Sequence, residues 1–279
     1  MRLELTGVAC GYGGTRIVEA FTASVASGHV LCLLGPNGVG KTTLLKCLLR
    51  TIPLLDGRIA VDGRDVHTFS TKAYAMLVAY VPQTHTPPFA FRVFDVVGMG
   101  RAAHQGLAAR LSREDEGVIH RCMEQLGILS LANRVYTELS GGERQMVLIA
   151  RALAQEPAFL LMDEPMSNLD FGNQARTLAT VAELSGQGIG IVMTTHHPDH
   201  IFMLDADAAL MLPGHQYLTG KADAVVTEEN LRHAYGIDVA VVDASYRGTP
   251  MRLCRPIIGT VNRSIVSSGE NISGLTIKE

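Results

Sequence analysis

The sequence has little cysteine, little charge and no long apolar run, and each shortage disfavours a class of protein. Its five cysteines form no C-x-x-C pair, which argues against a disulfide framework or a zinc ribbon and fits a reducing compartment. We expect these thiols to be buried as small hydrophobic groups. The charged fraction is 18%, with 24 Lys and Arg against 27 Asp and Glu, which disfavours a nucleic-acid coat or a polybasic membrane-surface protein.

No stretch of the sequence is typical of a membrane span or a secretory signal. The longest uncharged stretch, residues 20–40, is broken by Pro36 and by glycine and serine residues, and the next, 73–91, contains three prolines. A spanning helix needs about 20 mostly apolar residues in succession. The first residues include Glu4 and lack the long apolar segment of a signal peptide.

Short apolar runs alternate with helical patterns along most of the 279 residues, of which 47% are hydrophobic. Such alternation predicts a largely parallel sheet with helices on both faces. The patterns predict strands at 2–8, 29–34, 56–62, 158–162 and 190–195, and helices from Lys41, over 142–154 and over 174–184.

Turn and cap residues predict the remaining segments. We expect a glycine-rich turn at 10–14, and a helical region over 93–132 after a proline-rich break at 84–88. Thr227 is the expected N-cap of a helix over 227–235, and 238–242 alternates like an edge strand. The last twenty residues are rich in Ser, Gly and Asn and are expected to be loosely held.

Residues 35–43 read GPNGVGKTT and match the phosphate loop G-x-x-x-x-G-K-[ST], between a predicted buried strand and a predicted helix. The glycines let backbone N–H groups turn inward as a nest for phosphate oxygens, and the helix N-terminus adds partial positive charge. Lys41 can then reach the β- and γ-phosphates, and the Thr42 hydroxyl can bind Mg²⁺. A glycine-rich turn that binds no nucleotide is the alternative, which the flanking elements disfavour.

Two acids, Asp163 and Glu164, follow directly on the apolar run 158–162. Ligands of open α/β sheets bind outside the carboxyl ends of the strands, so both side chains are expected at the site. We predict that Asp163 holds Mg²⁺, directly or through water, and that Glu164 is the general base for the attacking water. A solvated strand end is the alternative, which the phosphate loop disfavours.

Between these motifs, residues 139–145 read LSGGERQ and open a predicted helix, a second glycine-rich helix N-terminus suited to phosphate. This segment resembles the signature motif of ATP-binding cassette (ABC) ATPases. The resemblance covers about residues 2–240, with the motifs in the expected order. It implies that ATP is bound from the phosphate loop by Asn37, Gly38, Gly40, Lys41, Thr42 and Thr43, and from the signature by Ser140, Gly141 and Gly142.

Four further positions match motifs of that family. Tyr12 in GYGG resembles the aromatic residue that stacks on adenine, and an ordinary turn tyrosine is the alternative. Gln83 in YVPQ resembles the Q-loop glutamine that binds Mg²⁺ and reports to the membrane partner. Asp170 in MSNLD resembles the D-loop acid that crosses the dimer interface. His196 in TTHHPDH resembles the switch histidine that contacts the γ-phosphate.

The histidines His196, His197 and His200 also suggest a metal site, because residues 196 and 200 have i,i+4 spacing. The family resemblance accounts for His196 without a metal, and Pro198 interrupts any helix there, so we disfavour this interpretation. The family often has Asp where His197 stands, which leaves the role of His197 open.

The resemblance implies an α/β fold, the ABC-type P-loop NTPase, with a RecA-like and mostly parallel core sheet, an N-terminal antiparallel β subdomain and an inserted helical subdomain. It assigns residues 2–240 to the ATPase domain, about 84–138 to the helical subdomain and 241–279 to a loosely ordered C-terminal extension. In this family the phosphate loop and the signature of one chain lie apart. Two chains therefore pair head to tail across two ATP molecules, as a homodimer or with a related chain.

FRVFDVVGMGR at 91–101, SNLDFGNQ after the acids, and TTHHPDH are similar to importers of iron chelates, haem and vitamin B12. The resemblance implies an ATP-hydrolysing subunit, peripheral on the cytoplasmic face of the inner membrane. Its implied partners are a second copy of itself, an integral-membrane permease and indirectly an extracytoplasmic substrate-binding protein, with no nucleic acid. Residues 91–101 are expected to form part of the permease-facing surface, and ordinary core and surface of a helical subdomain is the alternative for any single residue there.

Three alternatives to this interpretation remain. The cargo could differ, with molybdate or tungstate as examples, because an ATPase subunit does not touch the cargo. The chain could be a soluble ABC ATPase that acts in macromolecular assembly. It could also be a regulatory nucleotide-binding module without turnover, against which the intact Lys41, Asp163, Glu164 and His196 argue.

Overall fold

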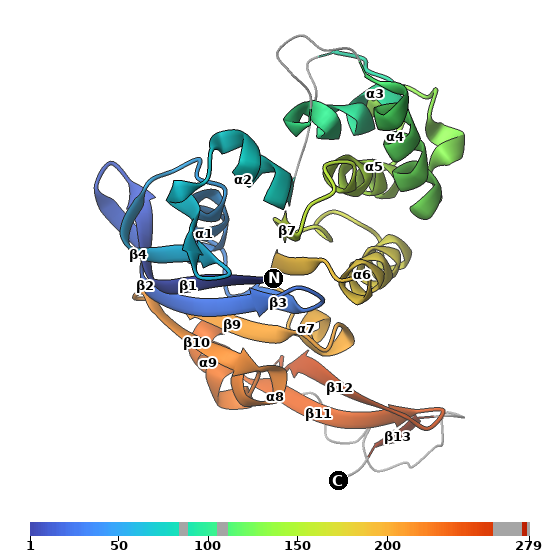
Figure 1. Ribbon diagram of the computed structural model, residues 1–279. Coiled ribbons are helices and arrows are strands. Elements are labelled where there is room, and N and C mark those ends of the chain that lie inside the picture. Colours follow the sequence, from blue (N-terminus) through green and yellow to red (C-terminus); the bar gives the residue numbers. More distant parts are fainter. Residues whose placement is uncertain (84–88, 105–110, 259–274, 278–279) are drawn as a thin grey trace.

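The computed structural model describes residues 1–83, 89–104, 111–258 and 275–277. The predicted break at 84–88 and most of the last twenty residues lie outside these ranges. A six-stranded sheet runs through the centre, parallel except for one edge strand, which confirms the predicted α/β class (Figure 1). Its order is β10 (Gln216–Lys221), β9 (Asp207–Leu212), β3 (Val30–Leu34), β8 (Gly190–Thr195), β7 (Phe159–Met162) and β6 (Val78–Val81).

The central strands are buried along their whole length, as expected for parallel strands covered on both faces. Leu31 and Leu33 of β3 point into a core shared with α1 (Lys41–Leu48), α2 (Thr71–Leu77) and an antiparallel sheet. Cys32 and Leu34 point into the core on the opposite face, shared with α5 (Gly141–Leu153) and α6 (Phe171–Gly186). Burying one leucine stabilises the folded chain by about 1.5–3 kcal/mol. The buried strands are therefore held firmly, and so is the edge of the sheet at which the loops after β3, β7 and β8 begin.

The second sheet is antiparallel and has four strands. Its order is β2 (Thr15–Ala26), β1 (Arg2–Tyr12), β4 (Leu54–Val61) and β5 (Arg64–Asp65). The expected turn at 10–14 is wrong in its first half, since β1 continues through Tyr12 and pairs it with Thr15. The turn is therefore limited to Gly13 and Gly14, both of which have positive φ angles.

Helices follow one another between β6 and β7, at the top right of Figure 1. Helix α4 begins at a capping box, in which the Ser112 hydroxyl accepts from the Asp115 backbone and the Asp115 carboxylate accepts from the Ser112 N–H. In the described part of the region predicted as helical, 93–132, the helices are short. They are α3 (Val93–Gly98), α4 (Arg113–Gln125) and the 3₁₀ helices η2 (Met99–Ala103) and η3 (Leu129–Leu131). Two further 3₁₀ helices lie outside this region: η1 (Val66–Thr68) precedes α2, and η4 (Tyr136–Glu138) precedes α5.

Residues 91–101 are expected to form part of a permease-facing surface, and the structure corrects this for Arg101. Its side chain is buried, and the guanidinium donates to Asp115 at 2.8 Å and to Glu156 at 2.6 Å. Val93, Val96 and Val97 are buried as well, because α3 turns its apolar face to the core. Much of the segment therefore packs inward, and Arg101 holds the pKa of the Asp115 carboxyl well below its usual range.

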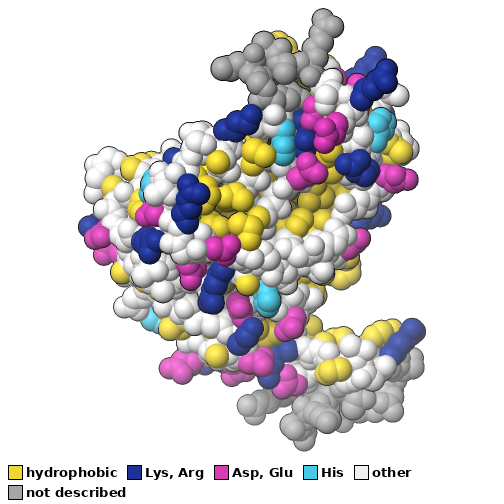
Figure 2. Space-filling view, in the orientation of Figure 1, with side chains coloured by type: hydrophobic (Ala, Val, Ile, Leu, Met, Phe, Trp, Pro, Cys, Tyr) yellow, Lys and Arg dark blue, Asp and Glu magenta, His cyan; other side chains and the backbone are white. Residues whose placement is uncertain are grey.

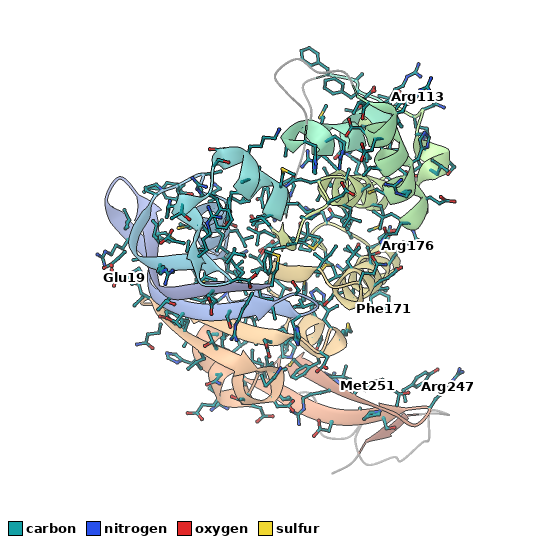
Figure 3. All side chains as sticks on the ribbon, viewed as in Figure 1. Glu19, Arg113, Phe171, Arg176, Arg247 and Met251 are labelled. Carbon is teal, nitrogen blue, oxygen red and sulfur yellow. The ribbon has the colours of Figure 1, made fainter. Side chains whose placement is uncertain are left out.

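Replacing Arg101 with methionine is expected to lower the free energy of unfolding by roughly 3–5 kcal/mol, because Asp115 then remains buried without its cation. Urea unfolding of the full chain measures the loss. Arg113→Met is the matched control, since Arg113 is exposed at the outer start of α4 (Figure 3). Equal stability of the two variants would mean that the buried ion pair contributes nothing.

The chain beyond β10 forms two helices and a small sheet. Thr227 caps α9 as predicted, because its hydroxyl accepts from the Asn230 N–H at 3.2 Å. The strand expected at 238–242 is confirmed as the first half of β11, where it pairs with β12 on one side; β13 pairs farther along, at 244–246. The boundary placed at residue 240 falls inside β11, and residues 241–256 are not loosely ordered but belong to a hairpin. The elements are α8 (Ala222–Val225), α9 (Glu228–Tyr235), β11 (Val239–Tyr246), β12 (Thr249–Pro256) and β13 (Leu275–Ile277).

Two expectations concern burial of apolar groups. Among the described residues, no helix has the length and apolar character that a membrane crossing requires. Cys10, Cys32, Cys47 and Cys122 are buried as expected, whereas Cys254 in β12 is only half-buried.

Candidate functional site

The phosphate loop connects β3 to α1, as the sequence predicts. Gly35, Gly38 and Gly40 all have positive φ angles, of 152°, 81° and 109°. A Cβ at Gly35 would lie 2.5 Å from the carbonyl oxygen of Met211, so the loop passes close to the neighbouring strand β9 and requires glycine there. Asn37 and Gly38 are exposed at the tip, where a ligand can reach the backbone.

Lys41 opens α1 and is 5% exposed. Its ammonium donates to the carbonyl oxygens of Gly35 at 2.7 Å and Pro36 at 2.9 Å. Burial lowers the pKa of Lys41, while the nearby carboxylates of Glu164 and Asp163 oppose this shift. The Lys41 ammonium thus hydrogen-bonds to two neutral carbonyl oxygens of the phosphate loop. Neutral oxygens bind an ammonium less strongly than phosphate oxygens do.

Asp163 lies at the carboxyl end of β7 and is 3% exposed. Its Oδ1 accepts from the hydroxyls of Thr42 at 3.1 Å and Thr194 at 2.8 Å. Thr42 is itself exposed, whereas Thr43 is buried in the first turn of α1. Hydroxyl and carboxylate oxygens are the donors that Mg²⁺ prefers, so this pair fits the predicted metal role.

Glu164 has a φ angle of 43°, in the left-handed region that costs a non-glycine residue about 1 kcal/mol or more. Its N–H donates to the Thr194 hydroxyl at 2.7 Å, which helps to hold this conformation. The Glu164 carboxylate accepts from the Gln83 amide at 2.9 Å and lies 3.8 Å from Nδ1 of His196. The left-handed backbone at Glu164 therefore directs its carboxylate toward Gln83 and His196, which lie on other loops.

Residues 196–200 follow β8 and contain three neighbouring imidazoles, those of His196, His197 and His200; we refer to them as the switch segment. His196 contacts His197 with ring centres 4.2 Å apart and a tilt of 44°, and His197 contacts His200 at 5.1 Å with a tilt of 51°. Burial lowers the pKa of His200 to about 4, so this ring is neutral at pH 7, and it hydrogen-bonds to Thr195 at 2.9 Å. His196 keeps 41% of its side chain exposed, which leaves its edge open to a ligand.

Tyr12 ends β1 with 46% of its surface exposed, and the Lys46 ammonium lies 6.0 Å from the ring centre. One ring face is therefore available for stacking beside α1. The adenine role predicted for Tyr12 remains a prediction.

The signature residues lie away from this cluster, and none of the interactions found among the described residues links them to it. The Ser140 hydroxyl caps α5 by accepting from the Glu143 N–H at 3.3 Å, while Glu143 accepts from the Ser140 N–H at 2.8 Å. Gly141 is exposed, and Gly142 is packed so closely on Asn173 that a Cβ would overlap that side chain. One chain thus brings together the phosphate loop, acids, Gln83 and His196, but not the signature.

Asp170 caps α6, since its carboxylate accepts from the backbone and side-chain amides of Asn173, both at 2.8 Å. Asn173 in turn contacts Gly142, so the D-loop and the signature helix are joined on one chain. The sequence patterns did not indicate a role for Asn173 or Thr194. Thr194 precedes the switch histidine by two residues at a strand end, and that position is the signal that could have found it.

A phosphate loop after β3, an acid pair after β7 and a histidine after β8 at one sheet edge define a P-loop nucleotide-binding protein. The sequence pattern of the ABC transporter family matches residues 18–167, and the chain belongs to this family. ATP-binding chains of ABC transporters are ATPases coupled to transport, so this chain binds ATP and hydrolyses it.

Similar proteins include chains named for different cargoes. A cobalamin import ATP-binding protein of Halobacterium salinarum is 38% identical over 86% of this chain, which spans 60% of that relative. An iron(3+)-hydroxamate import ATP-binding protein of Bacillus subtilis is 35% identical over 89% of this chain and 93% of the relative. A solved structure described as a metal-chelate type ABC transporter, in an inward-facing conformation, has a TM-score of 0.83 at 30% identity and covers 92% of this chain and 98% of its own.

Proposed function

We propose that this chain is the ATP-hydrolysing subunit of an importer for a metal chelate of the iron–siderophore, haem or cobalamin type. The observation that carries the proposal is the hydrogen-bonded cluster of Thr42, Asp163, Glu164 and Gln83, with His196 beside it, at the phosphate loop. Relatives named for cobalamin and iron(3+)-hydroxamate import support the cargo class. The chain would dock on a separate permease at the cytoplasmic face of the inner membrane.

Nucleotide binding follows from the loop geometry. The N–H groups of residues 37–43 would surround the phosphates, and Lys41 would exchange its two carbonyl acceptors for phosphate oxygens, a stronger charge-assisted bond. Tyr12 would cover the adenine with its exposed face. Thr42, Asp163 and the Gln83 amide oxygen would hold Mg²⁺, which would supply positive charge against the phosphates.

Hydrolysis needs a base, and the site offers Glu164. Its carboxylate would take a proton from a water molecule that attacks the γ-phosphorus, leaving ADP and phosphate. The Gln83 amide, 2.9 Å from the carboxylate, would hold it in place. The open edge of His196 would donate to a γ-phosphate oxygen, where negative charge develops.

A head-to-tail homodimer would supply the missing signature. Ser140 and Gly142 of one copy would close over the ATP held by Lys41 of the other, since a helix N-terminus attracts phosphate. Phe171, beside Asp170 at the start of α6, is 85% exposed and would be covered in that dimer (Figure 3). The separation of the signature from the acids on one chain supports this arrangement.

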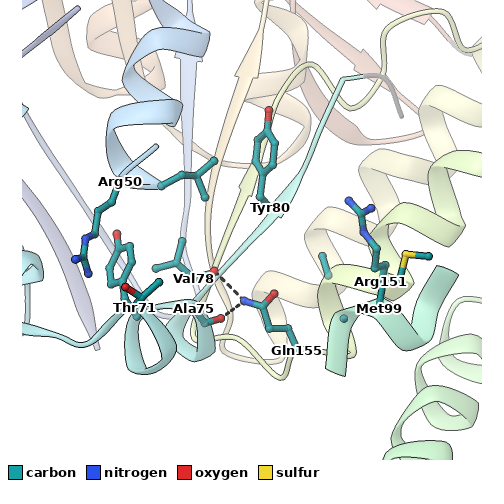
Figure 4. A pocket seen from close by; sticks show the side chains of 12 residues that line it. Arg50, Thr71, Ala75, Val78, Tyr80, Met99, Arg151 and Gln155 are labelled. Carbon is teal, nitrogen blue, oxygen red and sulfur yellow. Dashed lines mark hydrogen bonds between the residues drawn. The ribbon is translucent and has the colours of Figure 1, made fainter. Parts of the chain in front are cut away.

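The permease would dock in a cavity of about 460 Å³ between α2 and α5 (Figure 4). Tyr74, Val78 and Met99 give it an apolar lining, and Arg50 and Arg151 add positive charge. Figure 2 shows hydrophobic side chains gathered on this face between the two helices. A short amphipathic helix of the permease with an acidic residue would fit such a lining.

Purification of the tagged chain from detergent-solubilised native membranes tests this function. We expect a polytopic permease to accompany the parent chain and the Met203→Glu control, but not Met99→Glu, because a charge in the apolar cavity is costly. Recovery of soluble partners only, with ATPase activity intact, would instead indicate an assembly factor. The companion binding protein should take up an iron chelate, haem or cobalamin, and uptake of molybdate would overturn the cargo class.

A further inference from the structure

Tyr235, the last residue of α9, reaches two loops of the site from outside every motif described above. Its hydroxyl donates to the carbonyl oxygen of His196 at 3.4 Å. The backbone of Gly35, the first residue of the phosphate loop, lies near the same hydroxyl and opposes the rise in its pKa that burial causes. One side chain thereby joins the switch segment to the phosphate loop.

The Tyr235 hydroxyl is suited to contact both the His196 carbonyl and the Gly35 backbone. Burial raises the pKa of Tyr235, so the phenol stays protonated at neutral pH and can donate. The Gly35 backbone opposes that rise, as expected where an N–H dipole is directed at the hydroxyl oxygen, and the Gly35 carbonyl already accepts from Lys41. A neutral phenol can donate one hydrogen bond and accept another at the same time.

The C-terminal hairpin holds the same segment from the side of α7 (Asp199–Met203), against which β12 lies in Figure 1. The Asp199 carboxylate, three residues beyond His196, accepts from the Cys254 N–H at 2.7 Å. Arg252 in the same strand pairs with Asp223 at 2.6 Å and with Asp243 at 2.7 Å. The residues that follow His196 are therefore anchored, and Tyr235 acts on a segment with little freedom to move.

We propose that Tyr235 is a positioning residue for ATP hydrolysis, which sets the backbone of His196 at a fixed place relative to the phosphate loop. The imidazole of His196 then points at the γ-phosphate held by that loop instead of turning into solvent. This inference rests on the role of His196 in the proposed function, and a displacement of the His196 carbonyl would move its ring away from Glu164, now 3.8 Å distant.

Tyr235→Phe keeps the ring and removes only the hydroxyl. In the full chain we expect kcat to fall about five- to ten-fold, as for the loss of one or two neutral hydrogen bonds, while KM for ATP changes less than about two-fold. Tyr246→Phe, an exposed tyrosine at the end of β11, is the matched control and should keep the parent kcat. A parent-like kcat in Tyr235→Phe would overturn the proposal.

A double-mutant cycle separates positioning from general loss of structure. His196→Ala should lower kcat, and adding Tyr235→Phe to it should lower kcat no further, because the group being positioned is gone. An equal fall in both backgrounds would overturn the positioning role and leave the function intact. Parent-like turnover in His196→Ala would instead contradict the role of His196 in the proposed function.

Discussion

Glu164→Gln is expected to bind ATP with the affinity of the parent chain and to hydrolyse it about 10²–10⁴-fold more slowly. The amide has the same shape and can still accept from Gln83, which lies 2.9 Å from the carboxylate, but it cannot take a proton from water. The release of phosphate from ATP in the full chain measures the rate, and titration with ATP measures the affinity.

The matched control for Glu164→Gln is Glu183→Gln, an exposed glutamate on α6. It makes the same chemical change away from the cluster and should hydrolyse at the parent rate. A Glu164→Gln chain that hydrolyses as fast as this control would show that Glu164 is not the base.

Ser140→Arg is expected to abolish ATP hydrolysis while the same chain still binds ATP through its own phosphate loop. In a head-to-tail dimer the arginine would enter the site of the opposite subunit, where the exposed Ser140 would otherwise meet the phosphates. Loss of the N-cap alone costs only about 1 kcal/mol of helix stability, so the effect would exceed that of local unfolding.

Ser130→Arg provides the comparison for Ser140→Arg, because Ser130 is an exposed serine of η3 outside the signature. It should hydrolyse ATP normally. Retained hydrolysis in Ser140→Arg would contradict a site shared between two subunits, since the signature would then lie outside it.

The sequence predicted the parts of the site that follow directly on a buried strand. The phosphate loop after β3 and the acids after β7 were found because an apolar run and a polar motif adjoin in the chain. Parallel strands bring their carboxyl ends to one edge, so their closeness followed from the fold class. The roles of the individual residues stay predictions.

Contacts between distant segments could not be predicted in the same way. The bond between Gln83 and Glu164 spans 81 residues, and its geometry depends on β6 lying next to β7. Thr194 was missed because a threonine in a β-strand is ordinary, and only its bonds to Asp163 and Glu164 distinguish it.

Ion pairs between residues far apart in the sequence pattern explain the two clearest errors. Arg101 looked like a surface residue, but Asp115 and Glu156 come from elsewhere in the chain to neutralise it. The hairpin of β11 and β12 has a mixed polar sequence that did not predict a packed unit, yet Arg252 pairs with Asp243 across it.

The mass of the Glu164→Gln chain in solution, with and without ATP and Mg²⁺, tests most directly the claim that two copies share each ATP. The chain has a mass of 30.0 kDa, and light scattering should give that value without nucleotide. With saturating ATP, which this variant is expected to hydrolyse only slowly, the mass should rise to about twice that value. A mass that stays at 30.0 kDa while ATP is bound would contradict the shared site.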